Sequence, residues 1–317
     1  MITDLDLLLK HLPRRLRAAL EAIATDLVEI ALDLGRPPIV RLRPSVQPPY
    51  RELDGGAVSR DELEFIIGQV GTFRRHNRAG IEQTLHRLSL IRDRYGDALG
   101  ITIRVGRHLA GVAEVLRDLL EDDRESLLLI GPPGSGKTTL LRDAARILAE
   151  RLGPAVMIVD SHNEIGGDGK LPHPAIGAAR RMPVPDTVTQ HEILLEAVRN
   201  HFPTVVIIDE LGSRPEAEAA RTIASRGVRL IATAHGHHLE DIVGNSELTG
   251  LIGGGRERPV IGTAVVLLPQ RRFALYRKVA MVANALQAGG WVEPDEMRGD
   301  AFSLSAVHAS ASSNLGG

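Results

Sequence analysis

The sequence predicts an α/β protein of two domains, with a mainly parallel sheet in the larger one. Short apolar runs rich in β-branched residues alternate with amphipathic segments from about residue 126 onward, as expected when crossover helices join parallel strands. The 317 residues are also enough for two hydrophobic cores. We place a smaller N-terminal α/β domain at residues 1–118, a larger domain at 119–285 and a C-terminal tail at 286–317, whose Ser- and Ala-rich end is expected to be disordered.

The composition is that of an ordinary globular protein. Hydrophobic residues make up 43% of the chain, charged residues 25%, and the net charge is −2, so no overall positive field draws it onto nucleic acid or a membrane. The absence of cysteine excludes disulfides and thiolate metal sites. Residues 1–16 lack the features of a signal peptide, and no apolar run is long enough to span a bilayer. We therefore expect a soluble cytoplasmic protein without a transmembrane segment.

A glycine-rich turn separates the apolar run 127–130 from an amphipathic segment and matches G-x-x-x-x-G-K-[ST]. This pattern surrounds nucleotide phosphates with backbone N–H groups and a helix N-terminus. Lysine occurs only at positions 10, 137, 170 and 278, so the lysine at 137 indicates a requirement that arginine does not meet. We expect ATP to bind at Gly131, Pro132, Pro133, Gly134, Ser135, Gly136, Lys137, Thr138 and Thr139, with Mg²⁺ held by the Thr138 hydroxyl.

Acidic residues follow two further predicted strands. The apolar segment that starts at residue 204 runs into Asp209 and Glu210, and a parallel strand that delivers acids at its carboxyl end suits a hydrolytic nucleotide site. We expect Asp209 to hold Mg²⁺ and Glu210 to polarise the attacking water. Glu164 lies just past the strand that ends at Asp160, so it competes with Glu210 for the role of general base.

Three histidines lie in the segment "LIATAHGHHLED". His235 ends the predicted strand after the acid-bearing one, where it could sense the γ-phosphate or the attacking water. His237 and His238 enter a turn and helix, and we expect them to be exposed or at an interface. A metal site is disfavoured because no third ligand has a clear spacing.

The Gly- and Pro-rich segment 161–188 is expected to be an irregular loop, and a loop of this length is usually functional. Arg180 and Arg181 lie on it. They could act in trans on the phosphates of a neighbouring subunit, or they could form a solvated basic turn.

The N-terminal domain carries no complete catalytic motif. Residues 26–35 and 38–44 are expected to be paired strands, and Ser59 and Glu62 predict a capped helix. Residues 73–94 concentrate basic side chains, and their apolar spacing favours a charged helix face or a subunit contact over a nucleic-acid site. Near the C-terminus, two strands around Pro269 and Gln270 are expected to form a hairpin that extends the sheet.

The motif series "GPPGSGKTTLLRD", "VDSHNEIGGDG", "HPAIGAARRM", "VVIIDELG" and "IATAHG" resembles the stage III sporulation protein AA family and its chloroplast and cyanobacterial P-loop relatives. More distantly it resembles the type II and type IV secretion ATPases. The resemblance covers roughly residues 25–275. Some of the relatives carry a C-terminal domain that binds single-stranded nucleic acid, but the short segment after residue 285 does not fit such a domain.

The resemblance implies a RecA-like P-loop NTPase core that assembles into a homo-oligomeric ring, expected to be a hexamer, with ATP bound between subunits. It places Lys137 and Thr138 in Walker A, Glu164 in an acidic box, Asp209 and Glu210 in Walker B, and His235 in a histidine box. In secretion ATPases the acidic-box glutamate is favoured as the base, and arginines of the N-terminal domain reach the nucleotide. Arg104 and Arg107 hold that place here, and both could instead be ordinary charges at a strand end.

Our first hypothesis is a ring-forming, Mg²⁺-dependent ATPase that drives conformational work on a macromolecular partner, either a protein complex or a nucleic acid. The alternative is an ATP-gated nucleic-acid-binding or assembly switch with little turnover. A small-molecule kinase is a weaker third hypothesis, because the sequence shows no clear acceptor pocket or arginine-rich lid.

Overall fold

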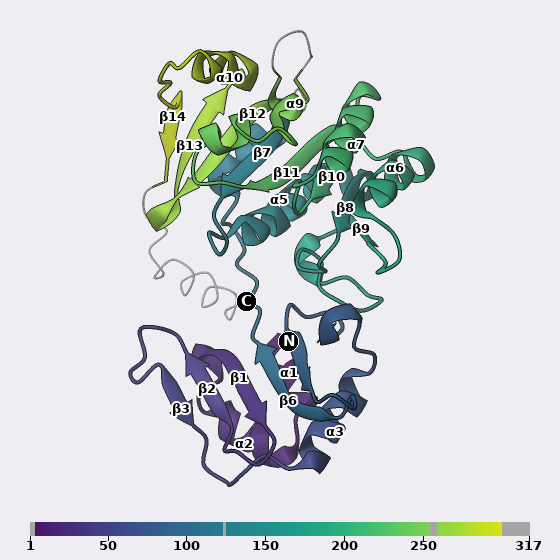
Figure 1. Ribbon diagram of the computed structural model, residues 1–317, viewed down its shortest axis with the longest axis vertical. Helices are drawn as coiled ribbons and strands as arrows, with labels where there is room; N and C mark the ends of the chain where they lie inside the picture. Colours follow the sequence, from purple (N-terminus) through teal and green to yellow (C-terminus); the bar gives the residue numbers. More distant parts are fainter. Residues whose placement is uncertain (1–3, 123–124, 254–258, 300–317) are drawn as a thin grey trace, which may run out of the picture. The chain divides into compact units, whose positions relative to one another are not determined.

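The computed structural model describes residues 4–122, 125–253 and 259–299, and the chain divides into two compact units (Figure 1). The N-terminal unit comprises residues 1–109 and 166–176, and the core unit comprises residues 110–165 and 177–317. The domain boundary expected at residue 118 placed residues 166–176 in the larger domain, whereas they group with the N-terminal unit. The chain therefore passes between the units three times.

The N-terminal unit is built on a six-stranded sheet in which every neighbouring pair is antiparallel. The strand order is β3 (Tyr50–Glu52), β2 (Ile39–Leu42), β1 (Leu27–Asp33), β6 (Ala98–Arg104), β5 (Arg87–Arg92) and β4 (Arg78–Gly80). The expected pairing of the first two strands is confirmed, with Ile30 opposite Val40.

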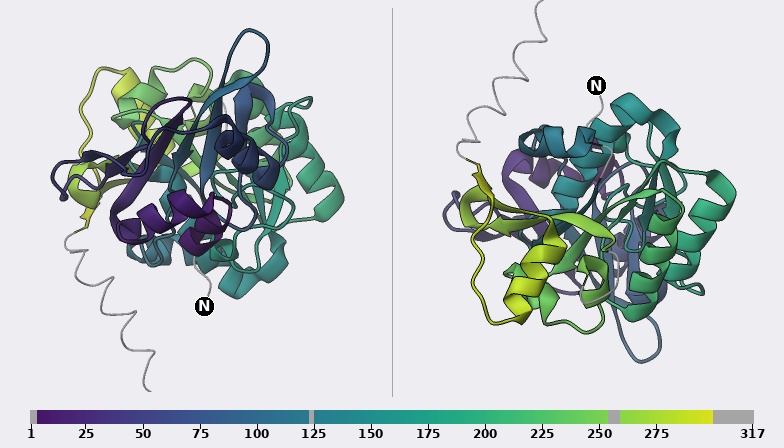
Figure 2. Two further views of the ribbon diagram at one scale, coloured as in Figure 1. Left: turned by 90° about the horizontal axis from the view of Figure 1, so that it is seen from below. Right: turned by 90° about the horizontal axis from the view of Figure 1, so that it is seen from above.

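Three helices pack on one face of this sheet: α1 (Asp4–Lys10), α2 (Arg14–Glu21) and α3 (Arg60–Val70) (Figure 2). Alternate strand residues such as Ile30 and Leu32 meet their leucines in a single buried cluster, as the two-residue period of a strand requires. The predicted cap of α3 is confirmed, because Ser59 Oγ accepts from Glu62 N at 3.2 Å and Ser59 N donates to the Glu62 carboxylate at 3.0 Å.

The expectation of a helix at residues 73–94 is wrong. This segment contains a short 3₁₀ turn (Arg75–Asn77) followed by β4 and β5. Leu88 and Leu90 are buried on β5 while Ile91 is exposed, so the apolar spacing follows the alternation of a strand. Two of the basic side chains make local contacts: Arg92 Nε donates to Asn77 Oδ1 at 3.0 Å, and the Arg94 guanidinium lies over the Tyr95 ring.

The core unit contains an eight-stranded sheet. Its order is β14 (Glu296–Arg298), β13 (Arg272–Arg277), β12 (Ile261–Leu268), β7 (Ser126–Gly131), β11 (Arg229–His235), β10 (Val205–Ile208), β8 (Val156–Asp160) and β9 (Arg180–Pro183). All neighbours from β12 to β9 are parallel, and β13 and β14 add an antiparallel edge. The mainly parallel sheet and the hairpin at Pro269 are both confirmed.

Helices join and cover the parallel strands. They are α4 (Arg117–Glu121), α5 (Lys137–Leu152), α6 (Gln190–His201), α7 (Arg214–Ser225), α8 (Leu239–Val243), α9 (Thr249–Ile252) and α10 (Val279–Gln287). Helix α5 packs on β7, β8 and β11, while residues of α6, α7 and α10 share one buried cluster with the sheet. No helix within the described ranges is both long enough and apolar enough to traverse a bilayer.

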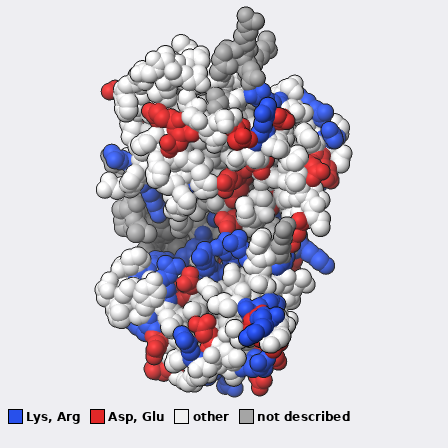
Figure 3. All heavy atoms as spheres, in the orientation of Figure 1, with Lys and Arg blue, Asp and Glu red and all other residues white. Residues whose placement is uncertain are grey.

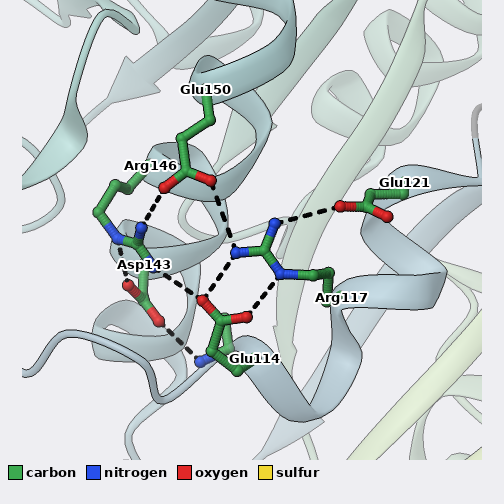
Figure 4. Close-up of polar contacts among 7 residues, drawn as sticks. Glu114, Arg117, Glu121, Asp143, Arg146 and Glu150 are labelled. Carbon is green, nitrogen blue, oxygen red and sulfur yellow. Dashed lines mark hydrogen bonds and ion pairs between the residues drawn. The ribbon is translucent and has the colours of Figure 1, made fainter.

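Arg117 and Arg146 tie the exposed side of α5 to the segment before it (Figure 4). Arg117 bonds the Glu114 and Glu121 carboxylates, and Arg146 bonds Asp143, Glu114 and Glu150. Asp143 also accepts from Ala113 N at 2.8 Å. Ion pairs that lie away from the first turn of α5 thus fasten this helix to the segment before it. Across the face drawn in Figure 3, acidic and basic side chains occur on both units, in keeping with the small net charge.

Candidate functional site: a P-loop at the carboxyl edge of the core sheet

The predicted phosphate loop connects the end of β7 to the start of α5. Gly134 has φ +76° and Gly136 has φ +97°, backbone conformations that side chains with a Cβ rarely adopt. At Gly131, an added Cβ would lie 2.5 Å from Ser135 Oγ, so the loop curls tightly over the strand end. Residues Pro133–Gly136 are exposed, and α5 directs its N-terminus at the space that the loop encloses. This arrangement of glycines and helix dipole is suited to an anion such as a phosphate chain.

Lys137 and Thr138 occupy the first turn of α5. The Lys137 side chain is buried, and its Nζ donates to Gly131 O at 2.7 Å and to Pro132 O at 3.0 Å. Burial lowers the pKa of Lys137, although the charges of Glu210 and Asp209 oppose this shift. A cation in this position can exchange its carbonyl partners for phosphate oxygens without leaving the loop.

Asp209 follows β10 and faces the P-loop helix. Its Oδ1 accepts from Thr138 Oγ1 at 3.2 Å, and its backbone oxygen accepts from Thr233 Oγ1 at 2.6 Å. Burial, and then the charges of Asp160 and Glu164, raise the pKa of Asp209 to about 6. A bound divalent cation would offset this concentration of negative charge.

The oxygen donors of Thr138 and Asp209 fit Mg²⁺, which prefers one or two protein oxygens together with phosphate and water. In the part of the chain that the structure describes, no three His, Asp or Glu side chains converge as a ready-made metal cage. The donor set therefore fits a metal ion that enters together with a phosphate ligand.

Glu210 and His235 form the second polar pair of the site. His235 Nε2 lies 3.1 Å from Glu210 Oε2, and both side chains are partly exposed. The topology explains the contact, because β11 lies between β7 and β10 in the sheet (Figure 1). His235 is paired in register with Gly131, so it stands between the phosphate loop and Glu210.

Glu164 is held through its backbone. Its N–H donates to Asp160 Oδ1 at 3.0 Å, and its carbonyl accepts from Arg142 of α5. Glu164 follows the carboxyl end of β8, and its charge contributes to the raised pKa of Asp209. Both candidate bases are therefore at the carboxyl edge of the sheet, Glu210 beside His235 and Glu164 on the side of Asp160 and Asp209.

The expectation that Arg180 and Arg181 lie on an irregular loop is wrong. They lie on β9, an edge strand parallel to β8, and not on an irregular loop. Pro183 pairs with Asp160, whereas Arg180 pairs with Met157, so Arg180 lies at the end of β9 opposite the carboxyl edge. A role for either arginine in trans stays a prediction.

Arg104 and Arg107 differ in their surroundings within the N-terminal unit. The Arg107 guanidinium donates to Leu27 O at 2.7 Å and to Ala24 O at 3.3 Å, which ties the chain after β6 to the start of β1. Arg104 is 61% exposed, and its Nε lies 3.5 Å from a Glu29 carboxylate oxygen. Of the two, Arg104 is the side chain that presents its charge to solvent.

The other histidines of the segment are exposed, as expected. Asp241 Oδ2 accepts from His237 N at 2.6 Å and from His238 N at 3.1 Å, which caps the start of α8. Sequence reasoning missed three residues that support the site: Arg142, Thr233 and Gln190, whose amide donates to Glu210 O at 2.7 Å. Each binds a backbone atom of a site residue far away in the sequence, so no local pattern marks them.

The sheet topology and the loop geometry are those of a P-loop ATPase fold of the RecA-like type, preceded by a smaller α/β unit, as predicted. Among solved structures, the pilus retraction motor PilT with bound ADP has a TM-score of 0.60 at 16% identity, covering 87% of this chain and 85% of that one. The ATPase DotB of Legionella pneumophila has a TM-score of 0.56 at 16% identity, with coverages of 87% and 85%. These likenesses concern the fold.

The chain belongs to the family described as "Sporulation stage III, protein AA", whose model matches residues 94–268. It is 48% identical over 253 residues to the uncharacterised protein ycf45 of Porphyra purpurea, covering 79% of this chain and 44% of that protein. It is 49% identical over 254 residues to the protein SEEDLING PLASTID DEVELOPMENT 1 of Arabidopsis thaliana, covering 79% of this chain and 36% of that protein.

Stage III sporulation protein AA of Bacillus subtilis is 34% identical over 161 residues, with coverages of 49% and 52%. The chain thus spans about half the length, or less, of each of these relatives. The resemblance inferred from the motifs is confirmed.

Proposed function

We propose that this protein binds ATP with Mg²⁺ at the P-loop and hydrolyses it to ADP and phosphate. The observation that carries the proposal is the gathering, at one sheet edge, of a glycine-formed loop, a lysine, the Thr138–Asp209 pair and the Glu210–His235 pair. Binding alone needs only the loop and the lysine. A partly exposed carboxylate beside them suits the activation of water.

In the proposed reaction, the loop N–H groups and Lys137 hold the β- and γ-phosphates. Mg²⁺, held by Thr138 and Asp209, would neutralise charge on the same phosphates. A carboxylate, Glu210 or Glu164, accepts a proton from water as the water oxygen bonds to the γ-phosphorus. The bond from that phosphorus to the bridging oxygen breaks, and ADP leaves with the bond's electron pair. His235 orients Glu210 through their 3.1 Å contact. The same histidine could sense whether the γ-phosphate is present.

We further propose that copies of the chain assemble into a ring, as a hexamer, with arginines of one subunit completing the site of the next. Arg104 is the leading candidate because it is exposed, and Arg180 and Arg181 remain alternatives. Hydrolysis would then move the N-terminal unit and perform work on a macromolecular partner. Support comes from the fold shared with a pilus retraction motor.

The proposal is tested by steady-state ATP hydrolysis of the purified protein, alone and with single-stranded DNA, duplex DNA, RNA or liposomes. Lys137→Ala serves as the blank, and the oligomeric state is measured with and without ATP. Lysine-dependent release of phosphate supports the proposal, and the additive that stimulates it indicates the class of partner. Tight ATP binding without turnover under every condition would favour the ATP-gated switch instead.

Glu210→Gln and Glu164→Gln decide between the two bases. The variant that lacks the base should bind ATP normally and lose turnover by about 100-fold or more, as expected for general base catalysis. Normal turnover in both variants would contradict this mechanism.

A further inference from the structure

The peptide that carries Glu164 is held by two side chains of opposite charge. The Asp160 Oδ1 atom accepts from Glu164 N at 3.0 Å and from Ile165 N at 3.3 Å. The Arg142 guanidinium donates to the carbonyls of the same two residues, with 2.7 Å from Nε to Ile165 O. Both N–H groups and both carbonyls of this dipeptide are therefore fixed by ionised groups, whose hydrogen bonds are stronger than neutral ones.

Arg142 itself is placed rigidly. It lies on α5, the helix whose first turn carries Lys137 and Thr138, and only 5% of its surface is exposed. Removing a guanidinium from water is unfavourable unless its N–H donors are used. Its planar fork matches two adjacent carbonyl oxygens, which an ammonium group cannot bridge in the same way. The Arg142 side chain therefore fixes the Glu164 backbone relative to α5.

The next residues along the chain are held elsewhere. Ile165 is the last residue of its stretch of the core unit, and Gly166 begins the segment 166–176 that belongs to the N-terminal unit. That segment is bonded within its own unit: Glu82 Oε1 accepts from Lys170 N at 2.8 Å and from Leu171 N at 3.0 Å. Any displacement of the N-terminal unit thus acts on the chain at Gly166, two residues beyond Glu164.

We propose that Arg142 is a positioning residue for Glu164, which it fixes to the P-loop helix against movements of segment 166–176. This inference rests on the proposed function and deepens it. Without the guanidinium, the Glu164 and Ile165 carbonyls would lose these bonds, and the Glu164 backbone would no longer be fixed to α5. Catalysis would suffer from the misplacement while Lys137 and Thr138 continued to bind nucleotide.

The test compares Arg142→Met, Arg142→Lys and Arg146→Met in the full chain. Arg146 is the matched control, because it lies on the same helix and bonds the carboxylates of Asp143, Glu114 and Glu150, none of which belongs to the proposed site (Figure 4). We expect Arg142→Met to lower kcat by about 10-fold or more while the Kd for MgATP stays within about 3-fold. Arg142→Lys should fall between that variant and the wild type, and Arg146→Met should keep the wild-type kcat.

A double-mutant cycle with Glu164→Gln shows whether Arg142 acts through Glu164. In the Glu164→Gln background, Arg142→Met should cause no further loss of kcat. Full, independent losses from the two substitutions, or a normal kcat in Glu164→Gln, would overturn the inference while leaving ATP hydrolysis intact. Equal losses of kcat and MgATP affinity in Arg142→Lys would show a merely structural role. No turnover in the wild-type protein would instead overturn the proposed function, and the inference with it.

Discussion

His235 Nε2 lies 3.1 Å from Glu210 Oε2, and the two side chains extend from the ends of neighbouring parallel strands. His235 is also the register partner of Gly131. A histidine in this position contacts the carboxylate and lies beside the phosphate loop, so it can couple the state of the phosphates to the orientation of the acid.

The first prediction concerns this pair. His235→Ala should lower kcat by about 10- to 100-fold, because Glu210 loses the partner that orients it. The Kd for MgATP should change little, since the loop and Lys137 are untouched. His235→Gln retains a donor at a similar reach and should recover part of the rate. If ATP affinity fell as much as kcat, the histidine would be needed for nucleotide binding and not for orientation.

The second prediction concerns Thr138, whose hydroxyl lies 3.2 Å from Asp209 Oδ1. Thr138→Val keeps the shape of the side chain but removes an oxygen ligand, so the gain in ATP affinity on adding Mg²⁺ should fall by about 10-fold or more. Thr138→Ser is the matched control and should retain most of that gain. Titration of ATP with and without Mg²⁺ measures both effects. An equal Mg²⁺ dependence in the Val and Ser variants would argue against a metal-binding hydroxyl.

The third prediction follows from the raised pKa of Asp209, about 6 against an ordinary 3.8. The folded protein binds this proton more tightly than the unfolded chain. The resulting stability is fully present below about pH 4 and is lost as the pH rises through about 6. At pH 8 the buried carboxylate costs at most about 3 kcal/mol, and Asp209→Asn removes that cost.

Urea unfolding without nucleotide or Mg²⁺ measures this difference. Asp209→Asn should gain clearly more stability over the wild type at pH 8 than at pH 4.5, where about a third of the difference remains. Glu293→Gln, a change at an exposed carboxylate of the same unit, should show no such pH dependence. An equal gain for Asp209→Asn at both pH values would contradict the raised pKa.

Much of the site was predictable because its functional residues are consecutive in the sequence and directly follow predicted strands. The P-loop pattern, Asp209 with Glu210, and His235 each follow an apolar run, and parallel strands bring their carboxyl ends to one edge. Which acid lies beside His235 could not be predicted, because that depends on β11 lying between β7 and β10 in the sheet.

Other features depend on contacts that leave no local pattern. Residues 73–94 have apolar positions compatible with both helical and strand periods, and the antiparallel sheet decided between them. Arg180 lies in a Gly- and Pro-rich segment, yet pairing with β8 makes it a strand residue. Arg142 resembles any arginine of an amphipathic helix, and only its bonds to Glu164 and Ile165 distinguish it.

The fourth prediction separates Arg104 from Arg107. Arg107→Ala removes two bonds to backbone carbonyls and should lower the free energy of unfolding by about 1–3 kcal/mol. Arg104→Ala removes an exposed charge and should change it by less than about 0.5 kcal/mol. If Arg104 acts in trans, a mixture of Arg104→Ala and Lys137→Ala should regain turnover, because one variant supplies the intact P-loop and the other the arginine. A mixture as inactive as its components would remove Arg104 from the candidates.

The fifth prediction concerns the anchor of segment 166–176 in the N-terminal unit. His173 is buried, its Nδ1 accepts from Ala175 N at 3.0 Å, and its Nε2 lies 2.9 Å from Asp4 Oδ2. The accepting role of Nδ1 implies that Nε2 carries the proton and donates it to the carboxylate. Burial alone would raise the pKa of Asp4, but the hydrogen bond from His173 lowers it below its ordinary value.

The lowered pKa fixes the sign of the pH dependence. The Asp4 carboxylate contributes stability above about pH 4, and this is lost as the pH falls through its lower folded pKa. Asp4→Ala should therefore destabilise the N-terminal unit at pH 7 by about 1–2 kcal/mol and speed amide exchange at Ala175. Asp4→Asn keeps an acceptor and should do both to a lesser extent, while Glu64→Ala, at an exposed site of the same unit, should do neither. Unchanged exchange at Ala175 in Asp4→Ala would mean that the contact between Asp4 and His173 does not anchor the segment.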